Sequence, residues 1–239
     1  MRKTVFITGG SRGIGACAVS EFARRGYNVA FTYLNSKENA ENLAKSTGAC
    51  AILCDVSSSE DVNKAINFAT DTFGKIDILI NNAGISEFSL FTDITDDKWH
   101  RMIETNLSSA FYASRAVLPQ MISRKNGVII NISSMWGQVG ASCETHYSVS
   151  KAGLIGLTKA LAKEVGPSGI RINCVCPGTI DTEMNAHLSN DDKEALINDT
   201  PLGKIGKCED VVNSLIFLPE DSSSFITGQI LGVNGGYII

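Results

Sequence analysis

Short apolar runs alternate with longer amphipathic segments along the whole chain. Apolar runs bounded by turn residues are typical of buried strands, and the longer segments carry helix formers. The predicted strands are 4–8, 28–33, 49–54, 77–81, 127–133, 170–176 and 229–233. The predicted helices are 16–25, 36–46, 60–73, 98–123, 146–165 and 210–218. About seven strands separated by helices predict an α/β fold, namely a Rossmann-type doubly wound parallel sheet with helices on both faces.

One segment departs from this alternation. Residues 179–207 are polar and rich in Asp, Asn and Ser. They follow the carboxyl end of a predicted strand, where ligands bind in open α/β sheets, so we predict a mobile lid over the substrate. An ordinary surface loop with a short helix fits the composition equally well. No repeat or linker divides the sequence, so residues 1–239 are interpreted as a single domain.

Composition excludes several classes of function. The net charge is -4 and no basic run occurs, which argues against nucleic-acid binding. No apolar stretch approaches the roughly 20 residues of a membrane span, and the first apolar run is shorter than the roughly 7–15 residues of a signal-peptide core. We therefore expect a cytoplasmic protein. The seven cysteines include no C-x-x-C, and Cys143 with His146 is a weak zinc signal, so no metal is expected.

The first predicted strand runs directly into a glycine-rich turn, Thr8-Gly9-Gly10-Ser11-Arg12-Gly13-Ile14-Gly15, and then into a helix. Strand, glycine turn and helix form the context that a dinucleotide fingerprint requires. Small residues let the backbone approach a diphosphate, and the helix N-terminus offers free N–H groups and partial positive charge. The spacing G-x-x-x-G-x-G is not the standard one, and such a turn alone is more often a plain connection. The flanking strand and helix favour a cofactor site.

The end of the second strand bears on which cofactor is bound. NAD sites usually place Asp or Glu there, roughly 20 residues past the glycines, to bind the ribose 2′-hydroxyl. Here Leu34-Asn35-Ser36-Lys37 brings no carboxylate, and Glu38 is the first. Arg12 and Lys37 are cations that can pair with a 2′-phosphate. We therefore predict NADPH. The alternative is that both cations are solvated surface residues.

A second group of residues can supply acid chemistry. Tyr147 and Lys151 lie one turn apart on a predicted helix and share a face. A cation at ~4 Å in an effective dielectric near 20 favours a phenolate by roughly 4 kcal/mol, or up to ~3 pKa units before burial costs. Such a tyrosine can protonate a carbonyl oxygen near neutral pH. Ser134, at the end of the strand 127–133, can hydrogen-bond the same oxygen. The same Tyr-x-x-x-Lys spacing occurs a second time, at Tyr33 and Lys37. These two residues lie on either side of a predicted strand end, so their side chains should not share a face.

With these motifs together, the chain resembles the short-chain dehydrogenase/reductase family over essentially its whole length. The motifs that carry the resemblance are Thr8–Gly15, Asp55-Val56, Asn81-Asn82-Ala83-Gly84, Thr105-Asn106-Leu107, Ser134, Tyr147, Lys151, Pro177-Gly178 and Thr182. The family pattern implies a nicotinamide cofactor that supplies the hydride, while the protein orients the substrate and controls the proton.

The resemblance also implies a role for each catalytic residue. Tyr147 is the acid/base, Lys151 lowers its pKa and binds the nicotinamide ribose, and Ser134 orients the substrate carbonyl. Asn106 holds a water in the proton relay. The family's thirteen-residue spacing to Tyr147 selects Ser134 rather than its neighbour Ser133. The implied cofactor contacts are Gly9, Ser11, Arg12, Gly13, Ile14, Gly15, Lys37, Asp55, Val56, Asn82, Ala83, Gly84, Tyr147, Lys151, Pro177, Gly178, Ile180 and Thr182.

Within the family, four phrases are most similar to bacterial 3-oxoacyl-[acyl-carrier-protein] reductases. These phrases are 105–109, 151–156, 225–229 and 233–236. The resemblance implies NADPH-dependent reduction of a 3-oxoacyl thioester in fatty acid synthesis, acyl carrier protein as a partner, and a homotetramer packed through two long helices and the C-terminal strand.

Some positions depart from that pattern. Carrier docking uses basic residues; Arg124-Lys125 stand at one such place, but Ser168 stands at the other. His146 precedes Tyr147 where Asn is common.

One alternative function is that of a reductase for a hydroxysteroid, a sugar or a small ketone. Its substrate preference would be set by the segments 86–96, 135–145 and 179–207. Another is a non-catalytic nicotinamide-binding protein, against which the intact active positions argue.

Overall fold

The computed structural model describes residues 2–186 and 188–239. Within these residues, seven strands form one sheet in the order β3-β2-β1-β4-β5-β6-β7, and every neighbouring pair is parallel. The strands are β1 Thr4–Ile7, β2 Asn28–Tyr33, β3 Cys50–Leu53, β4 Ile78–Asn81, β5 Gly127–Ile132, β6 Ile170–Pro177 and β7 Ile230–Val233. The predicted doubly wound sheet is confirmed. Its order reverses between β1 and β4, which is the switch point where such sheets bind ligands.

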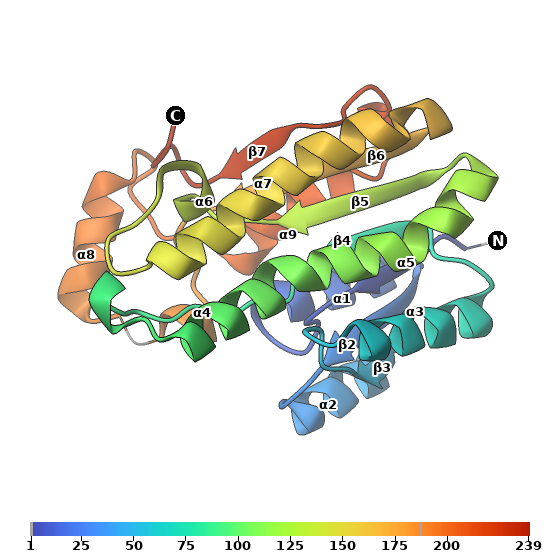
Figure 1. Cartoon of the computed structure of the whole chain (residues 1–239), viewed down its shortest axis with the longest axis horizontal. Helices are drawn as coiled ribbons and strands as arrows, with labels where there is room; N and C mark the ends of the chain where they lie inside the picture. Colours follow the sequence, from blue (N-terminus) through green and yellow to red (C-terminus); the bar gives the residue numbers. More distant parts are fainter. Residues whose placement is uncertain (1, 187) are drawn as a thin grey trace.

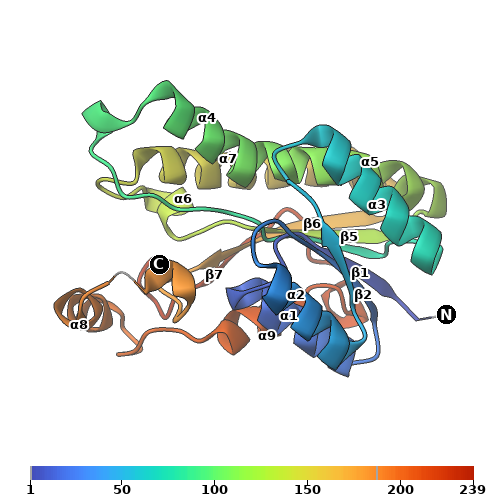
Figure 2. The same cartoon turned by 90° about the horizontal axis from the view of Figure 1, so that it is seen from below.

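Helices cover both faces of the sheet. Figure 2 shows α3, α4, α5 and α7 on one face and α1, α2 and α9 on the other. The helices are α1 Gly13–Arg24, α2 Lys37–Thr47, α3 Ser59–Phe73, α4 Asp96–Ile103, α5 Ser109–Arg124, α6 Trp136–Val139, α7 Thr145–Val165, α8 Asn190–Asp199 and α9 Cys208–Phe217. None of these described helices is both long and apolar enough to cross a membrane.

Alternation along the strands builds a separate core on each face. Val5 and Ile7 pack in the cluster that contains α1 and α9, whereas Phe6 between them packs with α3 and α5. Successive strand side chains point to opposite faces, so a strand buried on both faces must be apolar at every position. This explains why the strands are continuous apolar runs in the sequence.

The predicted helix 98–123 is interrupted in the structure. It consists of α4, a π-helical turn at Glu104–Ser108, and α5. Single π turns inside helices are rare and are frequent at functional sites. The side chain of Asn106, within this turn, bonds the main chain of Ile85. Because that bond reaches across 21 residues of sequence, helical periodicity could not reveal it.

The predicted lid has a defined base. Ile180 pairs with Gly206 in a parallel bridge, and the amide of Asp181 donates to the carbonyl of Gly206 at 2.9 Å. Beyond this base, α8 begins at a capping box formed by Ser189 and Asp192. The segment therefore contains the short helix that composition allowed. Its mobility stays a prediction.

In Figure 1, α6 and α8 lie on the side toward which β5 and β7 point, which is the carboxyl edge of the sheet.

Candidate active site

The three predicted catalytic side chains from β5 and α7 are buried together. Ser134 follows β5, while Tyr147 and Lys151 lie in the first two turns of α7; their exposed fractions are 7, 8 and 4 %. Burial raises the pKa of Tyr147 to about 12, and a hydrogen bond with Ser134 opposes that rise. The phenol is therefore kept protonated at neutral pH, with a hydroxyl partner in place.

Lys151 does not point its charge at the phenol oxygen in this structure. Its Nζ donates to the carbonyl of Ile132 at 2.9 Å and lies 5.7 Å from the centroid of the Tyr147 ring. Burial lowers the pKa of Lys151 to about 8. The sequence predicted that this cation lowers the pKa of Tyr147; in this structure that pKa rises, and burial is the largest cause. The lowering of that pKa by Lys151 therefore stays a prediction.

The two adjacent serines after β5 have different partners. The Ser133 hydroxyl donates to the main-chain carbonyl of Lys151 at 2.7 Å and fixes α7 against the strand. The Ser134 hydroxyl accepts from the amide of Trp136 at 3.1 Å and also bonds Tyr147. Ser134 is thus the serine that contacts the phenol, and its role at a substrate carbonyl stays a prediction.

Asn106 anchors one wall of the site. Its Oδ1 accepts from the amide of Ile85 at 2.8 Å, and its Nδ2 donates to the Ile85 carbonyl at 2.9 Å and to the Ser150 hydroxyl at 3.1 Å. The side chain, 1 % exposed, is fully engaged with protein. A Cβ on Gly84 would lie 3.3 Å from both Asn106 Oδ1 and Lys151 Nζ, so the glycine keeps this wall open. The water predicted at Asn106 stays a prediction.

The glycine turn forms a backbone cradle before α1. Gly9 and Gly13 have φ of +66° and +52°, which side chains rarely adopt. A Cβ on Gly15 would collide with the carbonyl of Gly9 and lie 2.6 Å from Asn82 Nδ2. The first turn of α1 carries no acidic side chain. Free amides at a helix N-terminus, close backbone approach and no carboxylate fit a bound diphosphate.

Two residues hold this cradle against β4. The Asn82 side chain donates to the carbonyls of Thr8 and Gly9 at 2.9 and 2.8 Å. The Thr8 hydroxyl accepts from the amides of Asn82 and Ala83, both at 3.0 Å. The sequence placed Asn82 in the cofactor cleft but did not assign the Thr8 hydroxyl any role. The only feature of the sequence that marked Thr8 was its position at the end of the first predicted strand.

Near the end of β2, where the sequence predicts the adenosine ribose, the structure has two cations and no carboxylate on the strand itself. Arg12 is exposed directly before α1, and Lys37 is exposed as the first residue of α2, 3.7 Å from the carboxylate of Glu41. The carboxylate of Asp55 accepts from the amide and hydroxyl of Ser57 at 2.9 and 2.6 Å. These positions fit the adenosine part of a dinucleotide, and the individual contacts stay predictions.

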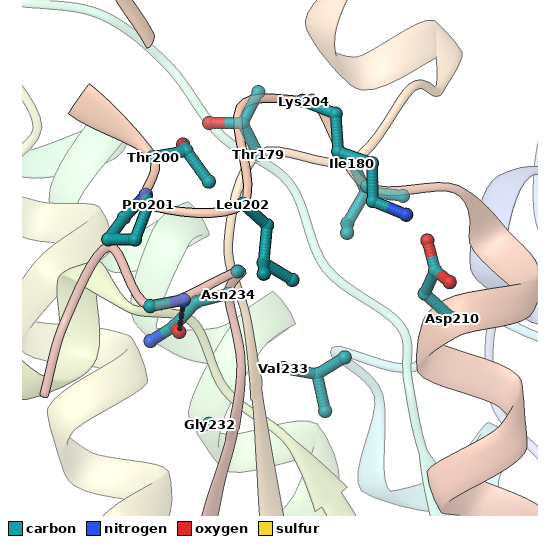
Figure 3. A pocket seen from close by; sticks show the side chains of 13 residues that line it. Thr179, Ile180, Thr200, Pro201, Leu202, Lys204, Asp210, Gly232, Val233 and Asn234 are labelled. Atoms are coloured by element: carbon teal, nitrogen blue, oxygen red, sulfur yellow. Dashed lines mark hydrogen bonds between the residues drawn. The ribbon is translucent and has the colours of Figure 1, made fainter. Parts of the chain in front are cut away.

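The segment after β6 closes the cleft from the other side. Thr182 Cγ2 lies 3.5 Å from where a Cβ on Gly13 would stand, so this segment reaches the glycine turn. Behind it, a cavity of about 540 Å³ opens between the base of the lid and the end of β7. Its lining is mainly apolar, with Lys204 and Asp210 on one side (Figure 3). None of the three buried catalytic side chains lines it.

Comparisons with known proteins agree with this geometry. A family model described as Enoyl-(Acyl carrier protein) reductase matches residues 9–238. The chain is 39 % identical to the 3-oxoacyl-[acyl-carrier-protein] reductase FabG of Staphylococcus aureus, covering 99 % of this chain and 98 % of that protein. It is 40 % identical to the FabG of Chlamydia trachomatis, covering 99 % and 97 %.

A solved structure is also similar. A double mutant of a Serratia marcescens short-chain dehydrogenase/reductase superposes with a TM-score of 0.92, at 35 % identity over 98 % of this chain and 97 % of that one. The chain belongs to the short-chain dehydrogenase/reductase family. It is accordingly an oxidoreductase of the nicotinamide-dependent class, similar to the bacterial 3-oxoacyl-[acyl-carrier-protein] reductases.

Proposed function

We propose that the protein uses NADPH to reduce the 3-oxo group of a 3-oxoacyl thioester, carried by acyl carrier protein or coenzyme A, to the 3-hydroxyacyl thioester of fatty acid synthesis. The observation that carries the proposal is the buried contact between the Tyr147 and Ser134 hydroxyls, with Lys151 beside them. The proteins of 39–40 % identity are named for this reaction, which supports the choice of substrate.

Each side chain has a separate task at the carbonyl. Ser134 donates a hydrogen bond to the ketone oxygen, and Tyr147 gives the proton to that same oxygen. The cofactor, when bound, supplies the hydride to the carbonyl carbon. Lys151 stabilises the phenolate that remains and binds the nicotinamide ribose. Burial keeps water away from the three groups, which strengthens their electrostatic interactions.

The choice of NADPH rests on the charge around the adenosine ribose. Arg12 stands beside α1, Lys37 begins α2, and no Asp or Glu ends β2.

In an Arg12→Gln variant we expect the Kd for NADPH to rise about tenfold or more, because a guanidinium–phosphate pair is lost, while the Kd for NADH changes little. Fluorescence titration with both cofactors measures this. Equal weakening of both would show that Arg12 does not read the 2′-phosphate.

The carrier is less strongly indicated than the thioester. Arg124, one of the two expected docking cations, donates to the carbonyl of Ile76 at 2.7 Å and to Gln120 Oε1 at 3.0 Å. Lys125 is exposed beside it, but both precede β5, whereas Ser134 follows that strand. A strand of this length spans about 20 Å. Coenzyme A thioesters are therefore proposed alongside the carrier-bound ones.

The substrate class is tested by comparing kcat/KM for acetoacetyl-CoA with kcat/KM for a simple ketone, a hydroxysteroid ketone and a keto sugar, each with NADPH. We expect the thioester to be preferred by at least tenfold. A stronger preference for one of the other ketones would move the assignment to that class. Cofactor binding without turnover of any of them would favour a non-catalytic nicotinamide-binding protein.

We also propose a homotetramer. The edge strand β7 exposes Leu231, and the nearby chain exposes Phe225 and Ile239 almost completely. Exposed apolar side chains beside an unpaired strand edge are typical of a contact between copies of a chain. Sedimentation equilibrium tests this, with a monomer mass as the result that would contradict it.

A further inference from the structure

His146 is a buried polar residue that the proposed reaction does not use. It is the second residue of α7, directly before Tyr147, and its exposed fraction is 0 %. Neither Nδ1 nor Nε2 has a hydrogen-bond partner within residues 2–186 and 188–239. An imidazole always carries at least one N–H donor, and a buried polar group without a partner is costly and calls for an explanation.

The main chain just before His146 joins two segments of the structure. The amide of Ser89 donates to the carbonyl of Cys143 at 2.8 Å and joins the segment 85–91 to the loop 139–145. Cys143 has φ of +60°, a strained conformation for a residue other than glycine. The amide of Ala141 donates to the Ser148 hydroxyl at 3.1 Å and ties the loop to the first turn of α7. His146 thus adjoins the junction between the segment 85–91 and the loop that leads to Tyr147.

Two charged groups act on the ring, both from the chain that packs against the start of α7. Glu87 favours the protonated ring and Lys98 disfavours it, and the two are themselves paired at 2.6 Å. Arg101 acts on Glu87 as well. Because Glu87, the carboxylate that acts on the ring, is already paired with Lys98, it compensates a charged imidazole only in part. Burial, the largest effect, accordingly lowers the pKa of His146.

We propose that His146 is a positioning residue which, as a neutral imidazole, holds the segment 85–91 against the loop 139–145, and that protonation of the ring releases this segment. The expected kinetic consequence concerns the ketone, because the segment 85–91 bonds Asn106 at one end and the loop before Tyr147 at the other. The pKa of the ring is lower when the segment 85–91 is packed than when it is released. Packing of this segment is therefore complete above the ordinary histidine pKa of about 6.5, and it is lost progressively as the pH falls below that value.

Amide hydrogen exchange of the peptide 85–91, at about pH 7.5 and about pH 5.5, tests the proposal. After correction for intrinsic exchange rates, we expect the wild-type peptide to open more at the lower pH, by up to about tenfold per pH unit for one coupled proton. His146→Asn, which cannot titrate, should remove this pH dependence. The matched control His100→Asn changes an exposed histidine on α4 and should behave like wild type.

A His146→Asn protein that keeps the wild-type pH dependence would overturn the proposal. If that variant does not fold, His146→Gln replaces it, and NMR titration of the wild-type ring decides independently: a ring pKa at or above about 6.5 would equally overturn it. A kinetic readout, which rests on the proposed function, should show KM for the ketone rising at acid pH by a larger factor than KM for NADPH. The exchange experiment needs no substrate, so it distinguishes failure of this proposal from failure of the proposed function.

Discussion

At the scale of single residues, burial governs the titration of the site. Loss of water disfavours whichever form is charged, so it raises the pKa of Tyr147 to about 12 and lowers that of Lys151 to about 8. At neutral pH the phenol carries its proton, as an acid must, and most Lys151 side chains are still charged. This is the protonation state that the proposed reduction of a ketone requires.

The pKa of Lys151 sets the alkaline limit of that state. A lowered lysine pKa means that the ammonium is lost as the pH rises through about 8, after which the phenolate keeps the hydrogen bond of Ser134 but loses its neighbouring cation. We expect kcat/KM for the ketone to fall above that pH, approaching tenfold per unit, because kcat/KM reports ionisations of the free enzyme. Steady-state rates between about pH 6.5 and 9.5 measure this. A flat profile would contradict the role given to Lys151.

The residues of the candidate site could be proposed from the sequence, but their hydrogen bonds could not. Tyr147, Lys151 and Ser134 were identified by type and spacing, which depend on local structure. The bonds from Lys151 to Ile132 and from Asn82 to Gly9 were not predicted, since they depend on how α7, β4 and β5 pack. Side-chain direction within a packed core is not encoded in the spacing of a motif.

At the scale of elements, the strands were predicted within about one residue because each is a continuous apolar run between turn residues. Short helical features were missed, and two of them lie near the site. The π turn at Glu104–Ser108 depends on the distant main chain of Ile85, and α6 is too short to show a periodic pattern. Both features adjoin the site, where local preferences are most often overridden by tertiary contacts.

The glycine turn is an element whose shape can be tested alone. Gly15→Ala places a methyl group against the carbonyl of Gly9 and Asn82 Nδ2, so the cradle must shift. We expect the Kd for NADPH to rise at least about tenfold, as positioning is lost. Isothermal titration calorimetry measures the Kd. Gly166→Ala is the matched control, because no neighbouring atom lies within 4 Å of the new Cβ and φ is -53°; comparable weakening in both variants would contradict the account.

At the scale of the whole molecule, sheet order explains why distant motifs form one site. β1 is flanked by β2 and β4, and β5 and β6 follow outward, so the glycine turn, Asn82, Ser134 and Gly178 all lie at the carboxyl edge. Parallel strands with right-handed crossovers require this arrangement. The fold class could therefore be predicted from alternation alone, whereas the shape of the lid base and of the cavity beside it could not.

The measurement that tests the central claim most directly is the loss of NADPH absorbance with acetoacetyl-CoA, compared between the wild-type protein and Tyr147→Phe. NADH replaces NADPH in a parallel series. We predict turnover with NADPH in the wild type and a loss of about 10²–10⁴-fold in the variant, the usual contribution of a positioned acid, with NADPH binding retained. Near-normal turnover by Tyr147→Phe would contradict the account, since the proton would then come from another group.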